Sequence, residues 1–247
     1  MMNMLFVELI TYMSKILIIP DIHGRTFWNI AKEMIDSVDK VVFLGDYLDP
    51  YPEEDITSDD ALSEFCKILE FKDKYPDKVV LLIGNHDMHY IELKFGNASR
   101  MDKLRRDEIH QLFMDDVDKF QLVYLLEDKY LFSHAGVYQK WLELTGLHGE
   151  DLLDTEKMLR DYWHVLDVYS WYRGGYGEIG SCVWADLRES LHTELLPNVI
   201  QIIGHTQLTK PYITTKLRCL DTRSCYILNT ETDAIKRYPE NVSEENN

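Results

Sequence analysis

The sequence predicts an α/β fold, and two kinds of segment support this class. Apolar runs rich in Val, Ile and Leu, typical of buried strands, occupy Lys15–Pro20, Lys40–Leu44 and Val79–Ile83. Helices are predicted between these runs, at Thr26–Asp36 and at Thr57–Lys74. The second helix carries apolar side chains at helical spacing, namely Ala61, Leu62, Phe65, Ile68 and Leu69.

Each of the three predicted strands is followed by a short polar motif. The motifs are Asp21-Ile22-His23-Gly24, Gly45-Asp46-Tyr47-Leu48-Asp49 and Gly84-Asn85-His86-Asp87. Taken singly, the first is also compatible with a helix N-cap at Asp21 and the other two with ordinary turns. Three such motifs at the ends of neighbouring strands instead bring together oxygen and imidazole ligands of the kind that divalent transition metals prefer. The sequence therefore predicts an enzyme active site with two metals.

Two later histidines occupy the same kind of position. His134 lies in Leu131-Phe132-Ser133-His134-Ala135-Gly136, and His205 lies in Ile202-Ile203-Gly204-His205-Thr206. Both follow short apolar runs, so we expect both side chains at the same edge as the first three motifs.

Taken together, these blocks resemble the calcineurin-like metallophosphoesterases, most of all the phosphoprotein-phosphatase branch and its bacterial relatives. The matching blocks run from residue 21 to residue 206. The resemblance implies a four-layer α-β-β-α sandwich of two mixed sheets flanked by helices. It also implies that the metals lie where loops leave the C-terminal ends of the strands.

The resemblance further implies a ligand set for two divalent ions. By this comparison Asp21 and His23 bind the first metal, Asp46 bridges both, and the second metal takes Asn85, His134 and His205. A bridging carboxylate suits the separation of about 3.5–4 Å that is typical of two-metal hydrolases. Because imidazole favours transition metals over Mg or Ca, we expect Mn, with Fe, Zn and Ni as alternatives.

The implied reaction is hydrolysis of a phosphomonoester, either a phosphoprotein or a small phosphorylated metabolite. A hydroxide bridging the metals would attack phosphorus in line with the leaving oxygen. His86 would protonate that oxygen as general acid, and Asp49 would fix the tautomer of His86. Cleavage of a dinucleoside polyphosphate or another phosphodiester is an alternative on the same site, and a non-catalytic metal-binding scaffold is a further alternative.

The chain departs from the family at the arginine that grips phosphate. In the eukaryotic-type phosphatases this Arg directly follows the Gly-Asp-x-x-Asp block, whereas here the residue is Pro50. Arg25, Arg173 and Arg188 are the candidates to replace it. The alternative for each of them is a surface ion pair in an acidic chain.

Composition limits the class of partner. The chain has 247 residues, of which 45% are hydrophobic and 28% charged, and its formal net charge is -17. This acidity argues against a nucleic-acid-binding surface, which needs basic stripes. No apolar run approaches the roughly 20 residues of a membrane span. With a poor signal peptide at residues 1–12, these features predict a cytoplasmic enzyme. The resemblance adds a phosphorylated substrate as the partner, and the sequence predicts no particular oligomeric state.

A single domain is predicted over residues 13–235. Residues 1–12 are expected to be a disordered N-terminal extension and residues 236–247 a flexible tail. Helical cap segments are expected near residues 88–126, with a break at Gly96-Asn97, and near residues 137–172. Glu92 and Arg100, in the first of these segments, are candidates for shaping the entrance to the site. The segment Pro211–Thr230 is expected to supply hairpin strands that complete the second sheet.

Overall fold

The computed structural model describes residues 14–95 and 99–239, and within them the strands form two mixed sheets. The first sheet has the order β11-β10-β1-β2-β3-β4 and the second has the order β5-β6-β7-β9-β8. In the first sheet, strands β1 to β4 run parallel to one another, whereas β10 pairs antiparallel with both β1 and β11. Its strands are β1 (Lys15–Ile19), β2 (Lys40–Phe43), β3 (Val79–Leu82), β4 (Phe120–Gln121), β10 (Cys225–Asn229) and β11 (Ala234–Tyr238).

The second sheet is also mixed. Strand β7 runs parallel to both of its neighbours, β6 and β9, while β5 and β8 are antiparallel edge strands. Its strands are β5 (Val123–Leu126), β6 (Tyr130–Ser133), β7 (Ile200–Ile203), β8 (Tyr212–Ile213) and β9 (Leu217–Cys219).

The two sheets face each other across an apolar core. Because successive strand residues point to opposite faces, Ile16 and Ile18 of β1 enter this inter-sheet core, where Phe132 and Ile202 of the second sheet also lie. The alternate residues Leu17 and Ile19 belong to the core on the outer face. Near-continuous apolar runs such as Lys15–Ile19 are therefore explained by burial on both faces.

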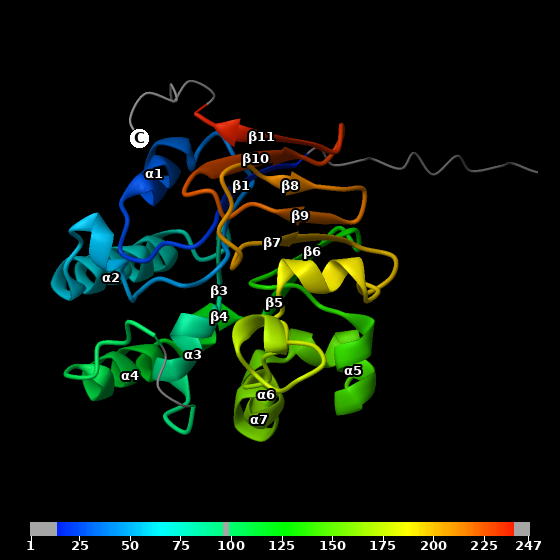
Figure 1. Ribbon diagram of the computed structural model, residues 1–247. Coiled ribbons are helices and arrows are strands. Elements are labelled where there is room, and N and C mark those ends of the chain that lie inside the picture. Colours follow the sequence, from blue (N-terminus) through cyan, green and yellow to red (C-terminus); the bar gives the residue numbers. More distant parts are fainter. Residues whose placement is uncertain (1–13, 96–98, 240–247) are drawn as a thin grey trace, which may run out of the picture.

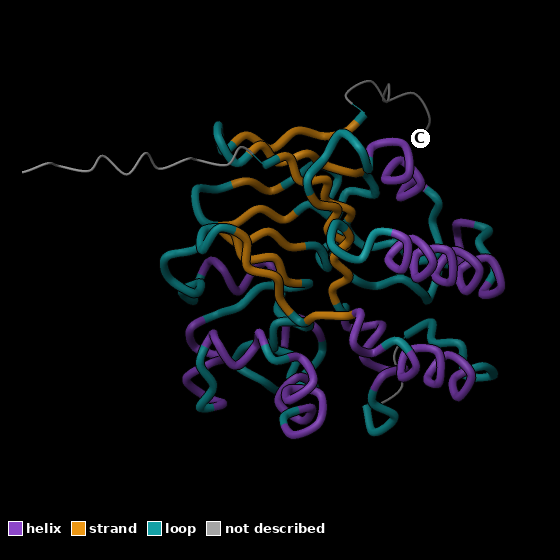
Figure 2. Tube along the Cα trace, turned by 180° about the vertical axis from the view of Figure 1, so that it is seen from behind, coloured by secondary structure: helices purple, strands orange, loops and turns teal. Residues whose placement is uncertain are grey.

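Helices cover the outer faces of the strands. Figures 1 and 2 show α1 and α2 along one side of the strands and α3 to α7 gathered at one end. Helix α2 begins with a capping box in which Thr57 and Asp60 exchange side chain to backbone hydrogen bonds, as a helix start of this composition predicts. The helices are α1 (Ile30–Met34), α2 (Ser58–Lys74), α3 (Asn85–Ile91), α4 (Arg106–Asp115), α5 (Gln139–Thr145), α6 (Thr155–Asp161) and α7 (Trp163–Leu166).

The predicted four-layer α/β sandwich is confirmed, and three local expectations need correction. The segment 88–126 is not largely helical, because its last residues form β4 and β5. The C-terminal strands are divided between the sheets, since β10 pairs with β1 of the first sheet instead of completing the second. Strand β11 continues to Tyr238, so residues 236–238 belong to the first sheet and not to a tail.

Some expectations concern segments that the structure does not describe. The extension at residues 1–12, the break at Gly96-Asn97 and the tail from residue 240 onward all lie outside the described residues. Among the helices that are described, none combines the length and the apolar character needed to cross a bilayer.

Candidate active site

Five loops that leave the C-terminal ends of strands converge at one end of the two sheets. Asp21 follows β1, Asp46 follows β2, Asn85 follows β3, His134 follows β6 and His205 follows β7. The backbone of these loops is unusual, since several site residues that are not glycine adopt positive φ angles: His23 at 46°, Asp46 at 55°, Asp49 at 61° and His205 at 63°. Such conformations cluster at functional sites, where the surrounding structure holds them in place.

One carboxylate oxygen of Asp46 lies between two histidines. Asp46 Oδ2 is 3.5 Å from Nε2 of His23 and 3.5 Å from Nε2 of His134. Each imidazole is oriented through its other nitrogen, because Nδ1 of His23 is 2.8 Å from the Leu48 carbonyl oxygen and Nδ1 of His134 is 2.7 Å from that of Leu44. A carbonyl only accepts, so Nδ1 of each ring carries a proton and donates it, which fixes the ring and turns its Nε2 toward Asp46.

The donor set on the His134 side is explained by a cation. Nε2 of His134 lies 2.9 Å from Oδ1 of Asn85 and 3.0 Å from Nδ1 of His205. Nε2 of His134, the amide oxygen of Asn85 and Nδ1 of His205 thus point to one another, and a cation between them could accept electron pairs from all three. Asp46, His134 and His205 form one group that can hold a metal, and Asp21, His23 and Asp46 form a second. The residues present therefore fit two metal ions that share Asp46.

Burial tunes these ligands for metal binding. Desolvation lowers the pKa of His23 and of His205 well below the usual value for histidine, with neighbouring positive groups adding to the effect. Neutral imidazole is the form that binds metal, so both rings are in the required state. Desolvation also raises the pKa of Asp46 well above its usual value, and a bound cation would offset that cost.

Two glycines allow the loops to approach one another. A Cβ at Gly84 would collide with Oδ1 and the backbone of Asp46, and a Cβ at Gly204 would collide with Oδ1 of Asp21. That oxygen of Asp21 accepts a hydrogen bond from the backbone N–H of His205 at 2.9 Å. The glycines that precede Asn85 and His205 are therefore needed for the close approach of the ligand loops.

His86 lies beside the ligand groups in a buried hydrogen-bonded chain. Its Nδ1 is 2.7 Å from Oδ2 of Asp49, and Oδ1 of Asp49 accepts a hydrogen bond from the hydroxyl of Tyr90 at 2.5 Å. The Tyr90 hydroxyl in turn accepts from the backbone N–H of Asp102 at 2.8 Å. With Nδ1 directed to Asp49, the second nitrogen of His86 is available to a ligand, which is the arrangement expected of a general acid.

Asp87 was not singled out from the sequence, yet it braces the site. Its buried carboxylate accepts hydrogen bonds from the backbone N–H groups of Asp46, Tyr47 and Gly84 at 2.8, 3.1 and 2.7 Å. Burial raises the pKa of Asp87 to about 6, although these hydrogen bonds favour the ionised form. This side chain joins the second and third motif loops, and only the fourth position of Gly-Asn-His-Asp pointed to it.

The three arginines expected to contact substrate lie in different surroundings. Arg25 is engaged by Glu54, to which its Nε and Nη2 donate at 2.7 and 2.9 Å. Arg173 places Nε 2.8 Å from Asp186 and donates from Nη2 to the hydroxyl of Thr206, next to His205, at 2.7 Å. Arg188 also pairs with Asp186, at 2.7 Å, and its side chain is 57% exposed. Arg173 thus reaches the neighbour of the candidate ligand His205, and Arg25 also touches the site, since its Nη1 donates to the carbonyl oxygen of Asp21 at 3.4 Å.

A fourth arginine, Arg100, reaches the site from the segment that follows α3. Its Nε donates to the carbonyl oxygen of Asp49 at 3.0 Å, and its Nη2 lies 3.4 Å from Nε2 of His86. The guanidinium stands 3.8 Å from the centre of the Tyr51 ring, which itself meets His23 edge-on at 5.1 Å. The sequence placed Arg100 near the entrance but gave no signal for these contacts, which depend on tertiary structure.

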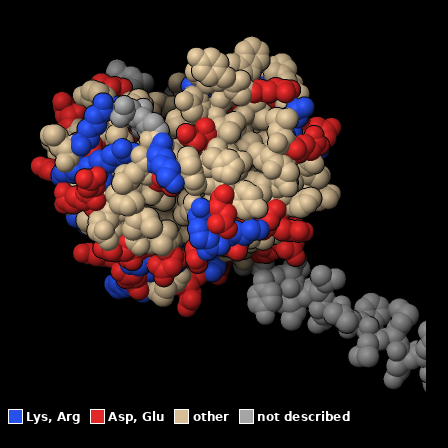
Figure 3. All heavy atoms as spheres, turned by 90° about the horizontal axis from the view of Figure 1, so that it is seen from below, with Lys and Arg blue, Asp and Glu red and all other residues tan. Residues whose placement is uncertain are grey.

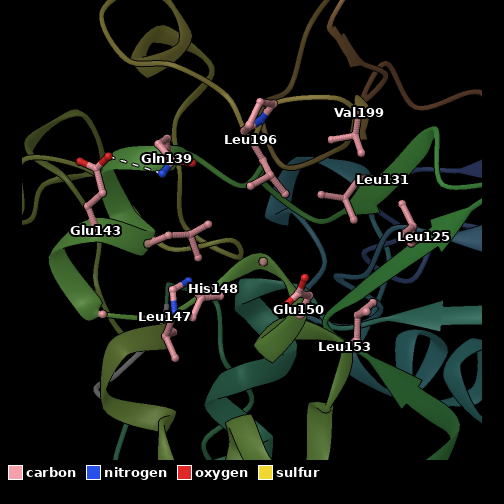
Figure 4. Close-up of a pocket in the computed structure, with 14 residues that line it drawn as sticks. Leu125, Leu131, Gln139, Glu143, Leu147, His148, Glu150, Leu153, Leu196 and Val199 are labelled. Carbon is pink, nitrogen blue, oxygen red and sulfur yellow. Dashed lines mark hydrogen bonds between the residues drawn. The ribbon is translucent and has the colours of Figure 1, made fainter.

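Two features outside the candidate active site are the distribution of surface charge and a separate apolar pocket. On the face shown in Figure 3, basic and acidic side chains lie interspersed around broad areas of other residues. Because the net charge of the chain is -17, its overall field does not attract anions, so capture of an anion falls to local cations. A pocket of about 640 Å³ lies beside β5, β6 and α5 and is lined largely by leucines such as Leu125, Leu131 and Leu153 (Figure 4). None of the motif residues lines this pocket, which is therefore distinct from the candidate active site.

Comparison with known proteins agrees with this geometry. Residues 14–207 match the model of a family described as calcineurin-like phosphoesterase. One curated relative, a probable serine/threonine-protein phosphatase of Encephalitozoon cuniculi, is 24% identical over 57% of this chain and 32% of its own length. A serine/threonine-protein phosphatase of Caenorhabditis elegans is 25% identical over 66% of this chain and 37% of its own length. The chain thus spans about a third of the length of these relatives.

Solved structures share the fold. A cold-active protein-tyrosine phosphatase of a psychrophilic Shewanella species has a TM-score of 0.59 and 14% identity, over 91% of this chain and 80% of that one. A protein serine/threonine phosphatase of Saccharomyces cerevisiae has a TM-score of 0.56 and 14% identity, over 91% of this chain and 79% of that one. At this identity the likeness concerns the fold alone.

Proposed function

The chain belongs to the calcineurin-like phosphoesterase family, and from this premise we propose that it is a metal-dependent phosphatase acting on a phosphomonoester. The observation that carries the proposal is the shared oxygen of Asp46, 3.5 Å from the free nitrogens of both His23 and His134. A single carboxylate between two oriented imidazoles is the arrangement that a pair of metal ions requires.

Two divalent cations, for which Mn is our first choice, would occupy the site. Asp21, His23 and Asp46 would hold one, and Asp46, Asn85, His134 and His205 would hold the other. When bound, such ions lower the pKa of a coordinated water and polarise the phosphoryl oxygens. The neutral oxygen of Asn85 limits the negative charge of the site and so favours an anionic substrate.

His86 would act as the general acid. The Asp49 carboxylate, 2.7 Å from Nδ1, keeps the proton of that nitrogen in place and stabilises the charged ring. The proton at Nε2 would then pass to the oxygen of the leaving alcohol as its bond to phosphorus breaks. Attack by water from the opposite side needs no covalent intermediate with the protein.

The proposed substrate is a phosphoprotein or a small phosphorylated metabolite. The names of the relatives as serine/threonine phosphatases support the first of these, although the chain matches only about a third of each relative. Arg173 is the proposed phosphate contact on the His205 side, since it lies within hydrogen-bond distance of Thr206. All three arginines are paired with a carboxylate, Arg25 with Glu54 and both Arg173 and Arg188 with Asp186, and of these Arg173 is proposed because it also contacts Thr206.

The first experiment compares p-nitrophenyl phosphate with bis-p-nitrophenyl phosphate, using protein loaded with Mn. Faster cleavage of the monoester supports the proposal, faster cleavage of the diester indicates a phosphodiesterase, and no turnover by Mn-loaded protein indicates a scaffold. His86→Asn should lower kcat by about 10²–10⁴-fold without loss of bound Mn. The loss should be larger for phenyl phosphate, whose leaving group needs the acid more. His192→Asn, at an exposed histidine, is the matched control.

A further inference from the structure

We propose that Arg100, held against the ring of Tyr51, is the cation that grips the substrate phosphate beside His86. The inference rests on the proposed function and names a binding residue for it. It also answers how the site replaces the arginine that Pro50 displaces.

The first argument is position. Nε of Arg100 donates to the carbonyl oxygen of Asp49, the residue that directly precedes Pro50, at 3.0 Å. The guanidinium therefore reaches the end of the Gly-Asp-x-x-Asp block from a segment 51 residues further along the chain. Its Nη2 lies 3.4 Å from Nε2 of His86, so the two nitrogens are close enough to contact oxygens of one phosphoryl group.

The second argument is charge. Arg25 pairs with Glu54, while Arg173 and Arg188 share Asp186. Within residues 14–95 and 99–239, Arg100 makes no ion pair with any carboxylate, and its polar contacts are with the Asp49 carbonyl oxygen and with Nε2 of His86. Its positive charge is therefore available to an anion, which a guanidinium binds through paired N–H donors.

The third argument is preorganisation. The Tyr51 ring lies 3.8 Å from the guanidinium carbon, and the hydrogen bond to Asp49 uses only Nε. Nη2 faces Nε2 of His86, and Nη1 has no hydrogen-bond partner among the described residues, so the guanidinium still offers N–H donors to a ligand. Arg100 itself adopts a positive φ of 66°, a backbone conformation that the other site loops share. A cation held in this way loses little conformational freedom when phosphate binds.

The test compares Arg100→Ala and Arg100→Lys with the parent protein, all loaded with Mn. Arg160→Ala, at an exposed arginine on α6, is the matched control. The readouts are kcat/KM for p-nitrophenyl phosphate and phenyl phosphate, the calorimetric dissociation constant of inorganic phosphate, and bound Mn. Arg100→Ala should lower kcat/KM by about 10²–10³-fold and weaken phosphate binding by at least about tenfold. Arg100→Lys keeps the charge but not the paired N–H donors of a guanidinium, so its kcat/KM and phosphate affinity should lie between those of the parent and Arg100→Ala.

The pattern across the two esters distinguishes gripping from an indirect effect. A phosphate clamp acts alike on both esters, so the two losses should agree, whereas the loss in His86→Asn depends on the leaving group. Unchanged phosphate affinity, a loss that is larger for phenyl phosphate, or loss of bound Mn would each overturn the assignment. If the parent protein hydrolyses neither ester, the proposed function fails, and phosphate binding still decides the role of Arg100. If Arg100→Ala does not fold, Arg100→Lys alone should weaken phosphate binding severalfold, and unchanged binding would refute the clamp.

Discussion

Removal of one hydroxyl group, in Tyr90→Phe, tests whether the hydrogen-bonded chain behind His86 is built as described. The Tyr90 side chain is fully buried, and its hydroxyl both donates to Asp49 at 2.5 Å and accepts from the backbone N–H of Asp102 at 2.8 Å. Burial and the adjacent Asp49 carboxylate raise the pKa of Tyr90, so the hydroxyl is protonated at every working pH. Phenylalanine keeps the ring and removes only these two hydrogen bonds.

The magnitude follows from the two bonds. A hydrogen bond to a charged group contributes about 1.5–3 kcal/mol, and a neutral one contributes about 0.5–1.5 kcal/mol. Their loss should lower the free energy of unfolding by roughly 2–4 kcal/mol, since Asp49 is left with a buried oxygen that lacks a donor. For a chain of this length, about 2–4 °C of Tm corresponds to each kcal/mol. Tm should therefore fall by roughly 4–16 °C.

Thermal unfolding of Mn-loaded protein measures the first effect, with Tyr176→Phe, at a fully exposed tyrosine, as the matched control. A second readout is turnover, which should fall more for phenyl phosphate than for p-nitrophenyl phosphate because His86 is held less firmly by Asp49. If Tyr90→Phe had the Tm of Tyr176→Phe and the parent's preference between the two esters, the described chain from Tyr90 to His86 would be refuted.

Two further predictions concern Gly204 in the site and Glu189, a buried carboxyl group outside it that contacts Ser170 and the backbone of Gly180. Gly204→Ala should weaken Mn binding by about 10–100-fold, because a Cβ would displace the Asp21 oxygen that accepts from His205; an unchanged calorimetric dissociation constant for Mn would contradict this. Glu189→Gln should change how stability depends on pH. Desolvation raises the pKa of buried Glu189, so its contribution is complete below the unfolded pKa and is lost as pH rises through the folded pKa. As pH rises from the ordinary glutamate pKa of about 4.3, the Gln variant should therefore lose less unfolding free energy than the parent, measured by urea titration, and parallel curves would argue against it.

The part of the site that lies on strand ends follows from local sequence. Asp21, Asp46 and Asn85 come within two residues of the ends of apolar runs typical of buried strands, and parallel strands carry their ends to one edge of a sheet. The structure indeed brings these residues together with His134 and His205. Their metal-binding role stays a prediction until ions are measured.

The remainder depends on contacts between distant segments. Arg100 meets Asp49 through a loop whose course no local pattern predicts. Strands β4 and β5 follow the charged helix α4 after only a short connection that contains no glycine or proline. The sequence therefore gives no signal for the end of the helix, and the predicted helical segment runs on to residue 126. Strand β10 joins β1 rather than the second sheet because its partner is chosen by the exposed edge of β1, which the sequence of β10 does not encode.

The left-handed loop residues set a limit on how this protein can be improved. His23, Asp46, Asp49 and His205 each occupy a conformation that costs an ordinary residue on the order of 1 kcal/mol. Glycine at any of these positions would remove the backbone strain, but it would also remove a proposed metal ligand or the Asp49 carboxylate that holds His86. A β-branched residue would increase the strain and would not supply the lost side chain. A directed-evolution campaign for heat resistance should therefore find its gains in the helices and the distal core, and every stabilising substitution that arises within these loops should be screened for loss of turnover.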